Sequence, residues 1–377
     1  MASSLIVGPT GLGTAAARVR KGRGFWPPRF AIPFPRRVNP EVERLRADGL
    51  AWARARGLVD TDEAVARLDA ARFDRLTAYA YPEARGAGAD LAAHWMYWFF
   101  LFDDWFDGPL GRDPAAARTV VERLTAHVHG GPAAVDGVPT DPPLVRAFVE
   151  LFDRSAAGMA PASRHRFALD TAQYLFTNYM EAFHRVRGGL DDLGTVTHVR
   201  RYSIGVLPSL DFGEPANGFS LAAELVGGEP LHRLRTITAD VIAAVNEAFS
   251  LGKDLALGET TSAAVTMMRL RRWTPEETIG FLERTVAELL DEHRRLEVEA
   301  REQAQRFGLP EEAGNVARYL QMLRDWMVAN LRWSEETPRY HDASPHPGAP
   351  ASPPGGADWT LPPAPRWRRV VAPARGT

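Results

Sequence analysis

Three acidic residues end a strongly aromatic stretch of the chain. Asp103, Asp104 and Asp107 follow the apolar run Trp95 to Phe102. On a helix, Asp103 and Asp107 would lie one turn apart on the same face, where like charges repel unless a cation sits between them. Acidic residues at a helix C-terminus also oppose the helix dipole, so an ordinary solvated turn explains them poorly. Hard carboxylate oxygens in a chain without cysteine favour Mg²⁺, and the motif therefore indicates a magnesium site.

A second group of polar residues recurs every four positions. Asn246, Ser250 and Asp254 would form a stripe along one helix face and offer an amide oxygen, a hydroxyl and a carboxylate. Such a set can hold one divalent cation with little total charge, which leaves substrate phosphates and water to complete the shell of Mg²⁺. The alternative is an ordinary polar helix face, which the stripe alone favours. Lys253, beside the stripe, could contact a phosphate as a point charge.

Two further groups carry arginines. A helix that bears Arg200 and Arg201 is expected to break at Gly205, because a proline follows three residues later. A broken helix inside a bundle frees backbone carbonyls that can face a cavity. Arg339 and Tyr340 stand where the helical part of the chain ends, and an Arg–Tyr pair there could hold a bound anion. Taken singly, each of these groups is more often structural than functional.

The elements that must position these residues are helical. Apolar residues recur every three or four positions, and no alternating strand pattern persists. The clearest helix begins at Thr274, where Thr-Pro-Glu-Glu forms a capping box with proline at the first helical position. We therefore predict one all-α domain over residues 26–341, between a flexible segment 1–25 and a Pro-rich disordered tail 342–377. Further helices are expected near 41–56, 62–79, 89–107, 114–129, 142–157, 162–186, 196–204, 230–252 and 311–334.

The composition excludes several classes of protein. The 45 basic residues nearly cancel the 47 acidic ones, for a net charge of -2, so we expect no basic face for nucleic acid and no polybasic membrane anchor. The absence of cysteine excludes disulfides, thiolate metal sites and thiol nucleophiles. Since no apolar run approaches the roughly 20 residues that a bilayer requires, we expect a soluble cytoplasmic protein.

In this order and spacing, the four groups resemble those of class I terpene synthases of the bacterial sesquiterpene cyclase type. The segment from Phe99 to Asp107 is similar to the aspartate-rich motif of that family, in the form of pentalenene-type cyclases. Asn246, Ser250 and Asp254 are similar to its second metal motif, which also has a lysine at the position of Lys253. That motif usually ends in glutamate, so the last ligand of this chain is one methylene shorter.

The resemblance implies a single α-helical bundle with a central active-site cavity. The implied reaction ionises a linear isoprenyl diphosphate, taken as farnesyl diphosphate, and cyclises the allyl cation to a sesquiterpene hydrocarbon or alcohol. Three Mg²⁺ ions are implied, with Mn²⁺ as a substitute. The implied metal ligands are Asp103, Asp107, Asn246, Ser250 and Asp254.

The resemblance also assigns roles to the remaining groups. Arg201 is implied as the diphosphate sensor, with Arg200 as the less favoured choice, and Ile204 and Gly205 as linker and effector. The implied diphosphate-binding residues are Arg201, Lys253, Arg339 and Tyr340. The implied aromatic lining, which would stabilise carbocations, consists of Phe99, Phe100 and Trp333.

Other functions remain open at this point. A cyclase for C10 or C20 diphosphates would carry the same motifs. A trans-prenyl elongating enzyme needs a second aspartate-rich motif, but Asp191 and Asp192 lack a third acid. A helical partner-binding protein would not explain why the second metal motif and the Arg339-Tyr340 pair occur together. A synthase weakened by Asp254 is a further possibility, and the chain could act as a monomer or a homodimer.

Overall fold

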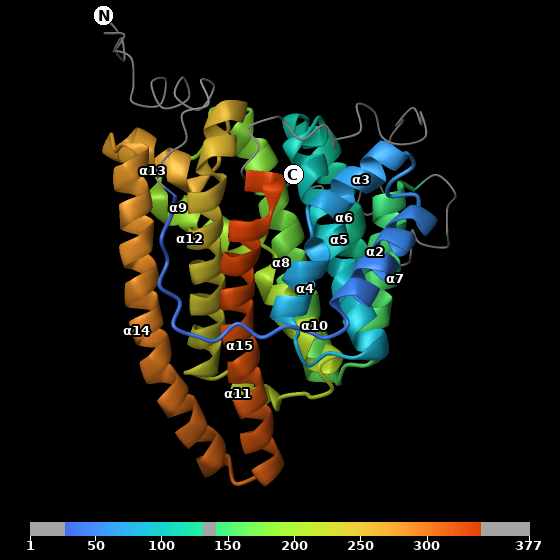
Figure 1. Cartoon of the computed structure of the whole chain (residues 1–377), viewed down its shortest axis with the longest axis vertical. Coiled ribbons are helices and arrows are strands. Elements are labelled where there is room, and N and C mark those ends of the chain that lie inside the picture. The colour runs from blue at the N-terminus through green and yellow to red at the C-terminus, as the bar shows by residue number, and fades with distance from the viewer. Residues whose placement is uncertain (1–26, 131–140, 341–377) are drawn as a thin grey trace, which may run out of the picture.

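The computed structural model of the chain describes residues 27–130 and 141–340. Within these ranges the secondary structure is helical, with no β-strand, which confirms the predicted all-α fold (Figure 1). The predicted flexible segment 1–25 and the predicted tail 342–377 lie outside the described residues. The division of the chain into one domain with two loose ends therefore stays a prediction.

The α-helices follow one another with short connections. In chain order they are α2 (Val42–Ala55), α3 (Asp62–Ala70), α4 (Phe73–Ala80), α5 (Gly86–Asp107), α6 (Pro114–Val128), α7 (Pro143–Ala157), α8 (Pro161–Arg185), α9 (Leu193–Ser203), α10 (Val206–Ala216), α11 (Ala223–Val226), α12 (Leu231–Leu257), α13 (Ala263–Arg271), α14 (Pro275–Phe307) and α15 (Pro310–Glu336). Two single turns of 3₁₀-helix, η1 (Leu110–Arg112) and η2 (Pro338–Tyr340), follow α5 and α15.

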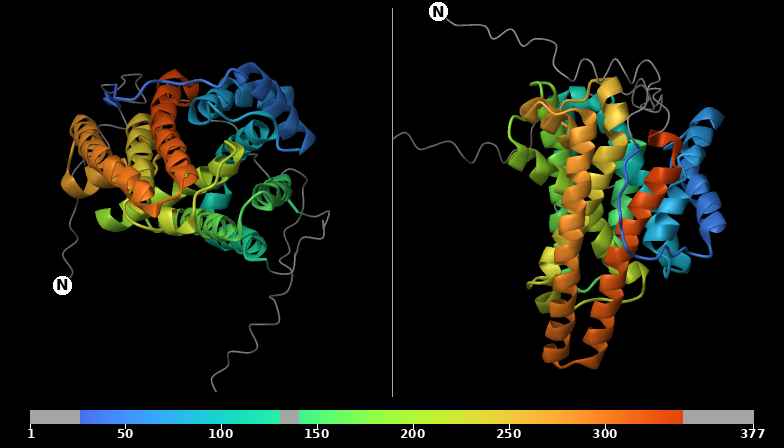
Figure 2. Two further views of the ribbon diagram at one scale, coloured as in Figure 1. Left: turned by 90° about the horizontal axis from the view of Figure 1, so that it is seen from below. Right: turned by 60° about the vertical axis from the view of Figure 1, so that its left-hand side comes forward.

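The long helices run side by side and enclose the interior of the bundle. Helix α12 packs against α14 and α15, and α5 packs against α2, α4, α7 and α10. Seen from below, the helices form a ring around the centre (Figure 2). Helices α14 and α15 form a hairpin that extends beyond the other helices (Figure 1). The C-terminal ends of α5, α12 and α15 lie together, since residues at these ends form ion pairs with one another.

The helix boundaries follow from local sequence at several points. The capping box at the start of α14 forms as predicted, with Thr274 accepting from the Glu277 amide and the Glu277 carboxylate accepting from the Thr274 amide. The stretch 62–79, predicted as one helix, is instead α3 and α4, because Arg72 takes a left-handed conformation with φ of 54°. A left-handed residue cannot continue a right-handed helix.

The break after α9 occurs where the sequence indicates. Gly205 has φ of 73°, a left-handed conformation that a residue with a side chain rarely adopts. Helix α10 begins immediately afterwards, and Pro208 is tolerated there because amide groups of a first helical turn have no intrahelical partner. The chain therefore changes direction at Gly205 while both helices stay inside the bundle.

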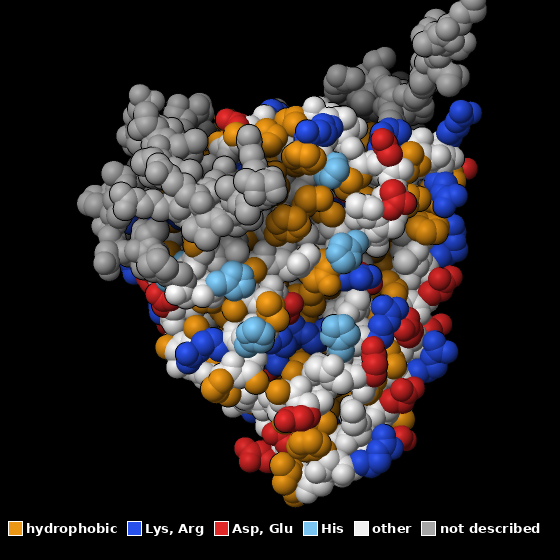
Figure 3. All heavy atoms as spheres, turned by 180° about the vertical axis from the view of Figure 1, so that it is seen from behind, with side chains coloured by type: hydrophobic (Ala, Val, Ile, Leu, Met, Phe, Trp, Pro, Cys, Tyr) orange, Lys and Arg blue, Asp and Glu red, His pale blue; other side chains and the backbone are white. Residues whose placement is uncertain are grey.

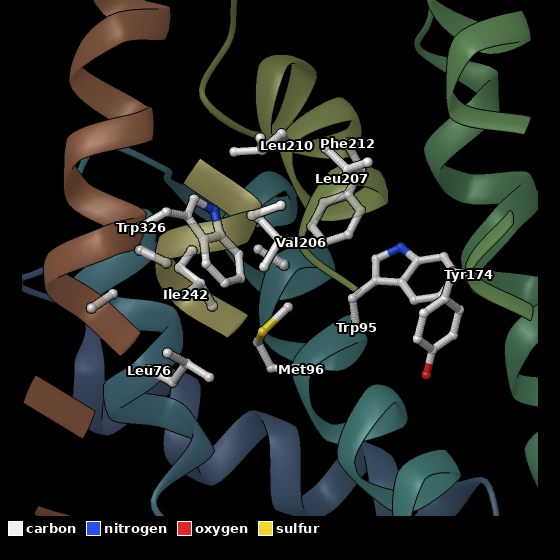
Figure 4. Close-up of a cluster of buried hydrophobic side chains, with 14 of the residues drawn as sticks. Leu76, Trp95, Met96, Tyr174, Val206, Leu207, Leu210, Phe212, Ile242 and Trp326 are labelled. Atoms are coloured by element: carbon white, nitrogen blue, oxygen red, sulfur yellow. The ribbon is translucent and has the colours of Figure 1, made fainter. Parts of the chain in front are cut away.

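A layer of large apolar side chains fills the centre of the bundle. Trp95 stacks on Phe99 and Phe212, with ring centroids 5.2 and 5.6 Å apart. Leu76, Met96, Val206 and Ile242 converge on the same region from four helices, together with Trp326 of α15 (Figure 4). Burial of such side chains contributes about 1.5–3 kcal/mol each, so this layer is the principal source of stability around the cavity described below.

The charges on one face of the described residues are mixed in sign. On the face opposite to that of Figure 1, acidic, basic and apolar side chains are interspersed (Figure 3). Among the helices that the structure describes, none combines the length and the apolar character that a membrane crossing needs. Residues 27–41 cross the outside of the bundle before α2, and Asn39 ties this segment down by donating to the carbonyls of Tyr81 and Ala84.

Candidate active site

A cavity enters the bundle at the end where α5, α12 and α15 terminate. Its mouth is lined by charged and polar side chains, among them Asp103, Asp107, Arg200, Asn246, Lys253 and Arg339. Its interior is lined mainly by apolar and aromatic side chains, among them Leu76, Met96, Phe99, Tyr174, Ile242 and Trp326. The arrangement suits a ligand with a highly charged head and a hydrocarbon body.

The acidic residues at the end of α5 form one half of the mouth. Asp103, Asp104 and Asp107 each present a carboxylate oxygen, and these oxygens lie within 4.8 Å of one another. Arg339 donates to Asp103 over 3.0 Å and to Asp104 over 2.7 Å, while Lys253 donates to Asp107 over 3.2 Å. We call these five residues the mouth cluster. Three acids against two cations leave the cluster with a net negative charge that a divalent cation would offset.

The crowding changes how readily these carboxyls ionise. Desolvation in the mouth, together with the negative charge of Asp107, raises the pKa of Asp103 to about 6. Burial also acts to raise the pKa of Asp107, but the charges of Lys253 and Arg185 outweigh it and hold that pKa below its ordinary value. Carboxylates that are close together and partly desolvated are suited to bind a metal ion.

The oxygen-bearing stripe of α12 forms the other half of the mouth. Asn246 Oδ1 accepts from Arg200 over 3.1 Å, and Asn246 Nδ2 donates to the Tyr340 hydroxyl over 2.7 Å. Ser250 donates to Asp254 over 2.8 Å, so these two side chains lie together on the cavity face of the helix. Burial raises the pKa of Asp254 to about 7, against the opposing charge of Lys253.

The two arginines of α9 are placed differently from the prediction. Arg201 pairs with Asp240 through two hydrogen bonds of 2.7 and 2.8 Å, and among the described residues that line the cavity Arg200 is present and Arg201 is not. Arg201 therefore does not line the cavity in this structure, and its assignment as the diphosphate sensor stays a prediction. The reason lies in the helical repeat: Val196, Val199 and Ser203 are the buried residues of α9, and Arg200 is on their side of the helix.

The other predicted residues come together at the cavity. Ile204, Gly205, Phe99, Phe100 and Trp333 all line it, as do the predicted ligands of α5 and α12 and the Lys253, Arg339 and Tyr340 group. A Cβ at Gly205 would lie 3.4 Å from Tyr174 and 3.5 Å from Phe99, so the backbone approaches these rings closely. The Gly205 carbonyl accepts from Ser209 over 2.7 Å, which fixes its direction.

The aromatic residues near the mouth form a continuous group. Phe100 stacks on Phe73 at 4.2 Å between centroids and lies 4.9 Å from Trp333. Phe99 meets Tyr174 edge to face at 5.0 Å. The guanidinium of Arg339 lies 5.3 Å from the Phe100 centroid, so a cation already occupies one aromatic face. Rings held by such neighbours keep fixed orientations toward the interior.

Several residues of the site carry no motif and were missed. Arg185 donates to Glu259 over 2.9 Å and to the Phe106 carbonyl over 3.0 Å, and it lies 3.7 Å from Asp107. Glu181, one helical turn earlier, accepts from Arg200 over 3.2 Å. A pair of opposite charges at i and i+4 near the end of an otherwise mixed helix was the available signal.

Comparisons with known proteins agree with this geometry. The family model described as terpene synthase family 2, C-terminal metal binding, matches residues 94–292. Pristinol synthase from Streptomyces pristinaespiralis is 39% identical over 317 residues, which are 82% of this chain and 84% of the relative. Pentalenene synthase from Streptomyces avermitilis is 36% identical over 272 residues, 71% of this chain and 79% of the relative. The crystal structure of linalool/nerolidol synthase from Streptomyces clavuligerus superposes with a TM-score of 0.73 at 28% identity, covering 81% of this chain and all of that one.

Proposed function

This chain belongs to terpene synthase family 2, and we propose that it is a Mg²⁺-dependent cyclase of farnesyl diphosphate. It would ionise the substrate, cyclise the allyl cation to a sesquiterpene hydrocarbon or alcohol, and release diphosphate. The observation that carries this proposal is one cavity in which two groups of oxygen ligands and four cations, Arg185, Arg200, Lys253 and Arg339, surround the mouth of an aromatic interior. The names of the relatives, pristinol and pentalenene synthase, support a C15 substrate.

The residues of the mouth fit a magnesium site. The donor atoms are carboxylate, amide and hydroxyl oxygens, which Mg²⁺ prefers, and the clustered carboxylates of α5 need positive charge. Asp103 and Asp107 would hold ions on the α5 side, and Asn246, Ser250 and Asp254 would hold one on the α12 side. When bound, Mg²⁺ supplies Lewis-acid neutralisation of the diphosphate leaving group. We propose three ions, and Mn²⁺ as a substitute.

Each cation of the mouth is paired with an atom that we propose as a metal ligand. Arg339 contacts Asp103, Lys253 contacts Asp107, and Arg200 contacts the amide oxygen of Asn246. These oxygens would hold the metal ions, and Arg339, Lys253 and Arg200 would then be able to donate to the diphosphate instead. Arg200 thereby takes the sensor role that the sequence gives to Arg201, because only the former reaches the mouth.

These groups act on the charge that develops as the carbon–oxygen bond breaks. Arg200, Lys253 and Arg339 would donate to the diphosphate oxygens, and the Tyr340 hydroxyl adds a further donor. The desolvated mouth strengthens these interactions over their value in water. Arg200, Lys253 and Arg339 would therefore stabilise the transition state more than the bound substrate, because the leaving group carries more charge in the transition state.

The interior then has to hold a carbocation without reacting with it. The faces of Phe99, Phe100 and Trp333 would each stabilise a nearby cation by about 0.5–2 kcal/mol and carry no nucleophile. Ile204 and Gly205 bring the backbone of the α9–α10 break to the same space. We propose that the final proton leaves to the released diphosphate.

Incubation with geranyl, farnesyl and geranylgeranyl diphosphate, followed by analysis of the volatiles, tests the proposal. We expect cyclic C15 products from farnesyl diphosphate, their loss on chelation of the metal, and their recovery with Mg²⁺ or Mn²⁺. Products from only the C10 or the C20 substrate would make the chain a cyclase of another chain length. Metal-dependent products from none of the three would overturn the proposal.

A further inference from the structure

The carboxylate of Glu247 joins two elements at the mouth of the cavity. Glu247 follows Asn246 in α12 and is only 3% exposed. Its Oε1 accepts from Arg200 Nε over 2.6 Å. Its Oε2 accepts from the Ser262 hydroxyl over 2.6 Å and from the Ala264 amide over 2.8 Å. One buried carboxylate therefore connects the C-terminal end of α9 to the first turn of α13.

On one side, Glu247 fixes the plane of the Arg200 guanidinium. With Nε held by Glu247, one terminal nitrogen donates to Glu181 and Ser203, and the other donates to Asn246 over 3.1 Å. The second terminal nitrogen is the one beside a proposed metal ligand. The orientation of the fork, which sets how that nitrogen is aligned with the leaving group in the transition state, thus depends on the Nε contact.

On the other side, Glu247 fixes the connection 258–262 between α12 and α13. Ser262 is the N-cap residue of α13, and Thr261 and Ser262 line the cavity. The beginning of the same connection is tied to α8, because Glu259 accepts from Arg185 over 2.9 Å. The wall of the mouth between α12 and α13 is thus held at both ends by carboxylates that also contact the arginines of the mouth.

We propose that Glu247 is a positioning residue that orients Arg200 for the diphosphate and couples it to the connection 258–262. The inference rests on the proposed function, in which Arg200 binds the diphosphate. A shift of Arg200 onto the leaving group moves the Glu247 carboxylate, and with it the first turn of α13. The orientation of Arg200 and the position of the connection 258–262 therefore change together.

Only a carboxylate can make both connections at once. Glutamate offers acceptor oxygens on both sides, whereas glutamine offers one acceptor oxygen and one amide nitrogen, which is a donor. In Glu247→Gln the side chain keeps its size, but its one acceptor oxygen can accept either from Arg200 or from the Ala264 amide, both of which can only donate. The substitution therefore separates the two elements without emptying the site.

The test compares kcat, KM and diphosphate affinity in Glu247→Gln and the wild type, with farnesyl diphosphate and Mg²⁺. We expect kcat to fall at least tenfold. KM and the inhibition constant of inorganic diphosphate should change less than threefold, because Arg200 keeps its charge. Asp240→Asn is the matched control, since Asp240 pairs with the neighbouring Arg201 outside the cavity, and it should leave all three quantities within twofold.

Ser262→Ala supplies a second variant that removes only one hydroxyl donor. It should lower kcat about threefold by itself, and the double variant Glu247→Gln/Ser262→Ala should be no slower than Glu247→Gln alone, because both changes act through one carboxylate.

The outcomes separate this inference from the proposed function. A wild type without turnover would overturn the proposed function. Given an active wild type, three results would overturn the role of Glu247. The first is an unchanged kcat in Glu247→Gln or in Ser262→Ala. The others are a parallel loss of kcat and diphosphate affinity, and additive effects in the double variant. If Glu247→Gln fails to fold, Ser262→Ala decides alone.

Discussion

Two clusters of acids and cations among the described residues differ in what they face. The mouth cluster lines a cavity, and the Asp103 side chain keeps 47% of its surface exposed. The second, which we call the buried ionic cluster, lies about 27 Å away along α12, judged from the 18 residues between Arg235 and Lys253. It consists of Arg166, Asp170, Asp211, Glu214, Arg235 and Tyr319.

The buried ionic cluster is built around Arg235. Arg235 donates to Asp170 over 2.6 Å and to Tyr319 over 2.7 Å, and it lies 2.9 Å from Asp211. Burial raises the pKa of Asp170 to about 7 and likewise that of Glu214, much as desolvation raises the pKa of Asp103. Perturbed pKa values therefore do not distinguish the two clusters. Access to the aromatic cavity does, because the mouth cluster opens onto it, whereas Glu214 of the buried ionic cluster lines only a separate pocket with Met159 and Phe219.

The comparison of the mouth cluster with the buried ionic cluster predicts that substitution of Asp103 has the largest effect on turnover. Asp103→Asn should lower turnover of farnesyl diphosphate by about 10³-fold, because it removes a proposed metal ligand from the leaving-group side. The unfolding midpoint should stay unchanged or rise, since the substitution removes repulsion with Asp107. Steady-state kinetics and calorimetry on the same preparation measure both. A large loss of stability would place Asp103 with the residues of the buried ionic cluster.

For Arg235 we expect the reverse, a loss of stability with little change in turnover. Arg235→Met should lower the free energy of unfolding by about 3 kcal/mol, because three acceptors lose a buried charged partner. Turnover per folded molecule should change little, since Arg235 does not reach the cavity. Urea unfolding gives the stability, with Arg201→Met as the control: the Arg201–Asp240 pair is partly exposed and should contribute about 1 kcal/mol or less. Equal losses in the two variants would remove the distinction between a buried network and a partly exposed pair.

The sequence supported correct predictions wherever residues share one helix. Asn246, Ser250 and Asp254 lie together because the helical repeat alone places every fourth residue on the same face. Asp103 and Asp107 come together for the same reason. The left-handed Gly205 was also predictable, since glycine adopts that conformation without steric cost.

The sequence could not supply contacts between helices. The Glu247 link to Ser262 and the Arg185 link to Glu259 depend on how α8, α12 and α13 pack, which no local pattern specifies. The choice between Arg200 and Arg201 is different, because the apolar positions Val196 and Val199 of the same helix already indicate that Arg200 is the inward residue. Family resemblance gave the motif, and the helical repeat was needed to choose between neighbours.

The choice between Arg200 and Arg201 as the residue that contacts the diphosphate has its own test. Arg200→Gln should lower kcat/KM by about 10²-fold, since it removes a charged donor from the leaving group, whereas Arg201→Gln should lower it less than threefold. Both changes remove one positive charge from adjacent positions of α9, so long-range electrostatics is matched between them. Kinetics with farnesyl diphosphate at fixed Mg²⁺ provides the comparison. A larger effect at Arg201 would restore the assignment that the family motif favoured.

The smallest effect is expected at the residue that departs from the family pattern. Asp254 is held by Ser250 and its pKa is raised to about 7, so near neutral pH a metal ion competes with a proton for this carboxylate. Asp254→Glu adds one methylene, which lets the carboxylate reach further toward an ion while it can still accept from Ser250. We expect the Mg²⁺ concentration for half-maximal activity to fall about threefold with kcat preserved, as measured by metal titration at pH 7. Abolished turnover in a folded Asp254→Glu variant would instead overturn the assignment of Asp254 as a metal ligand.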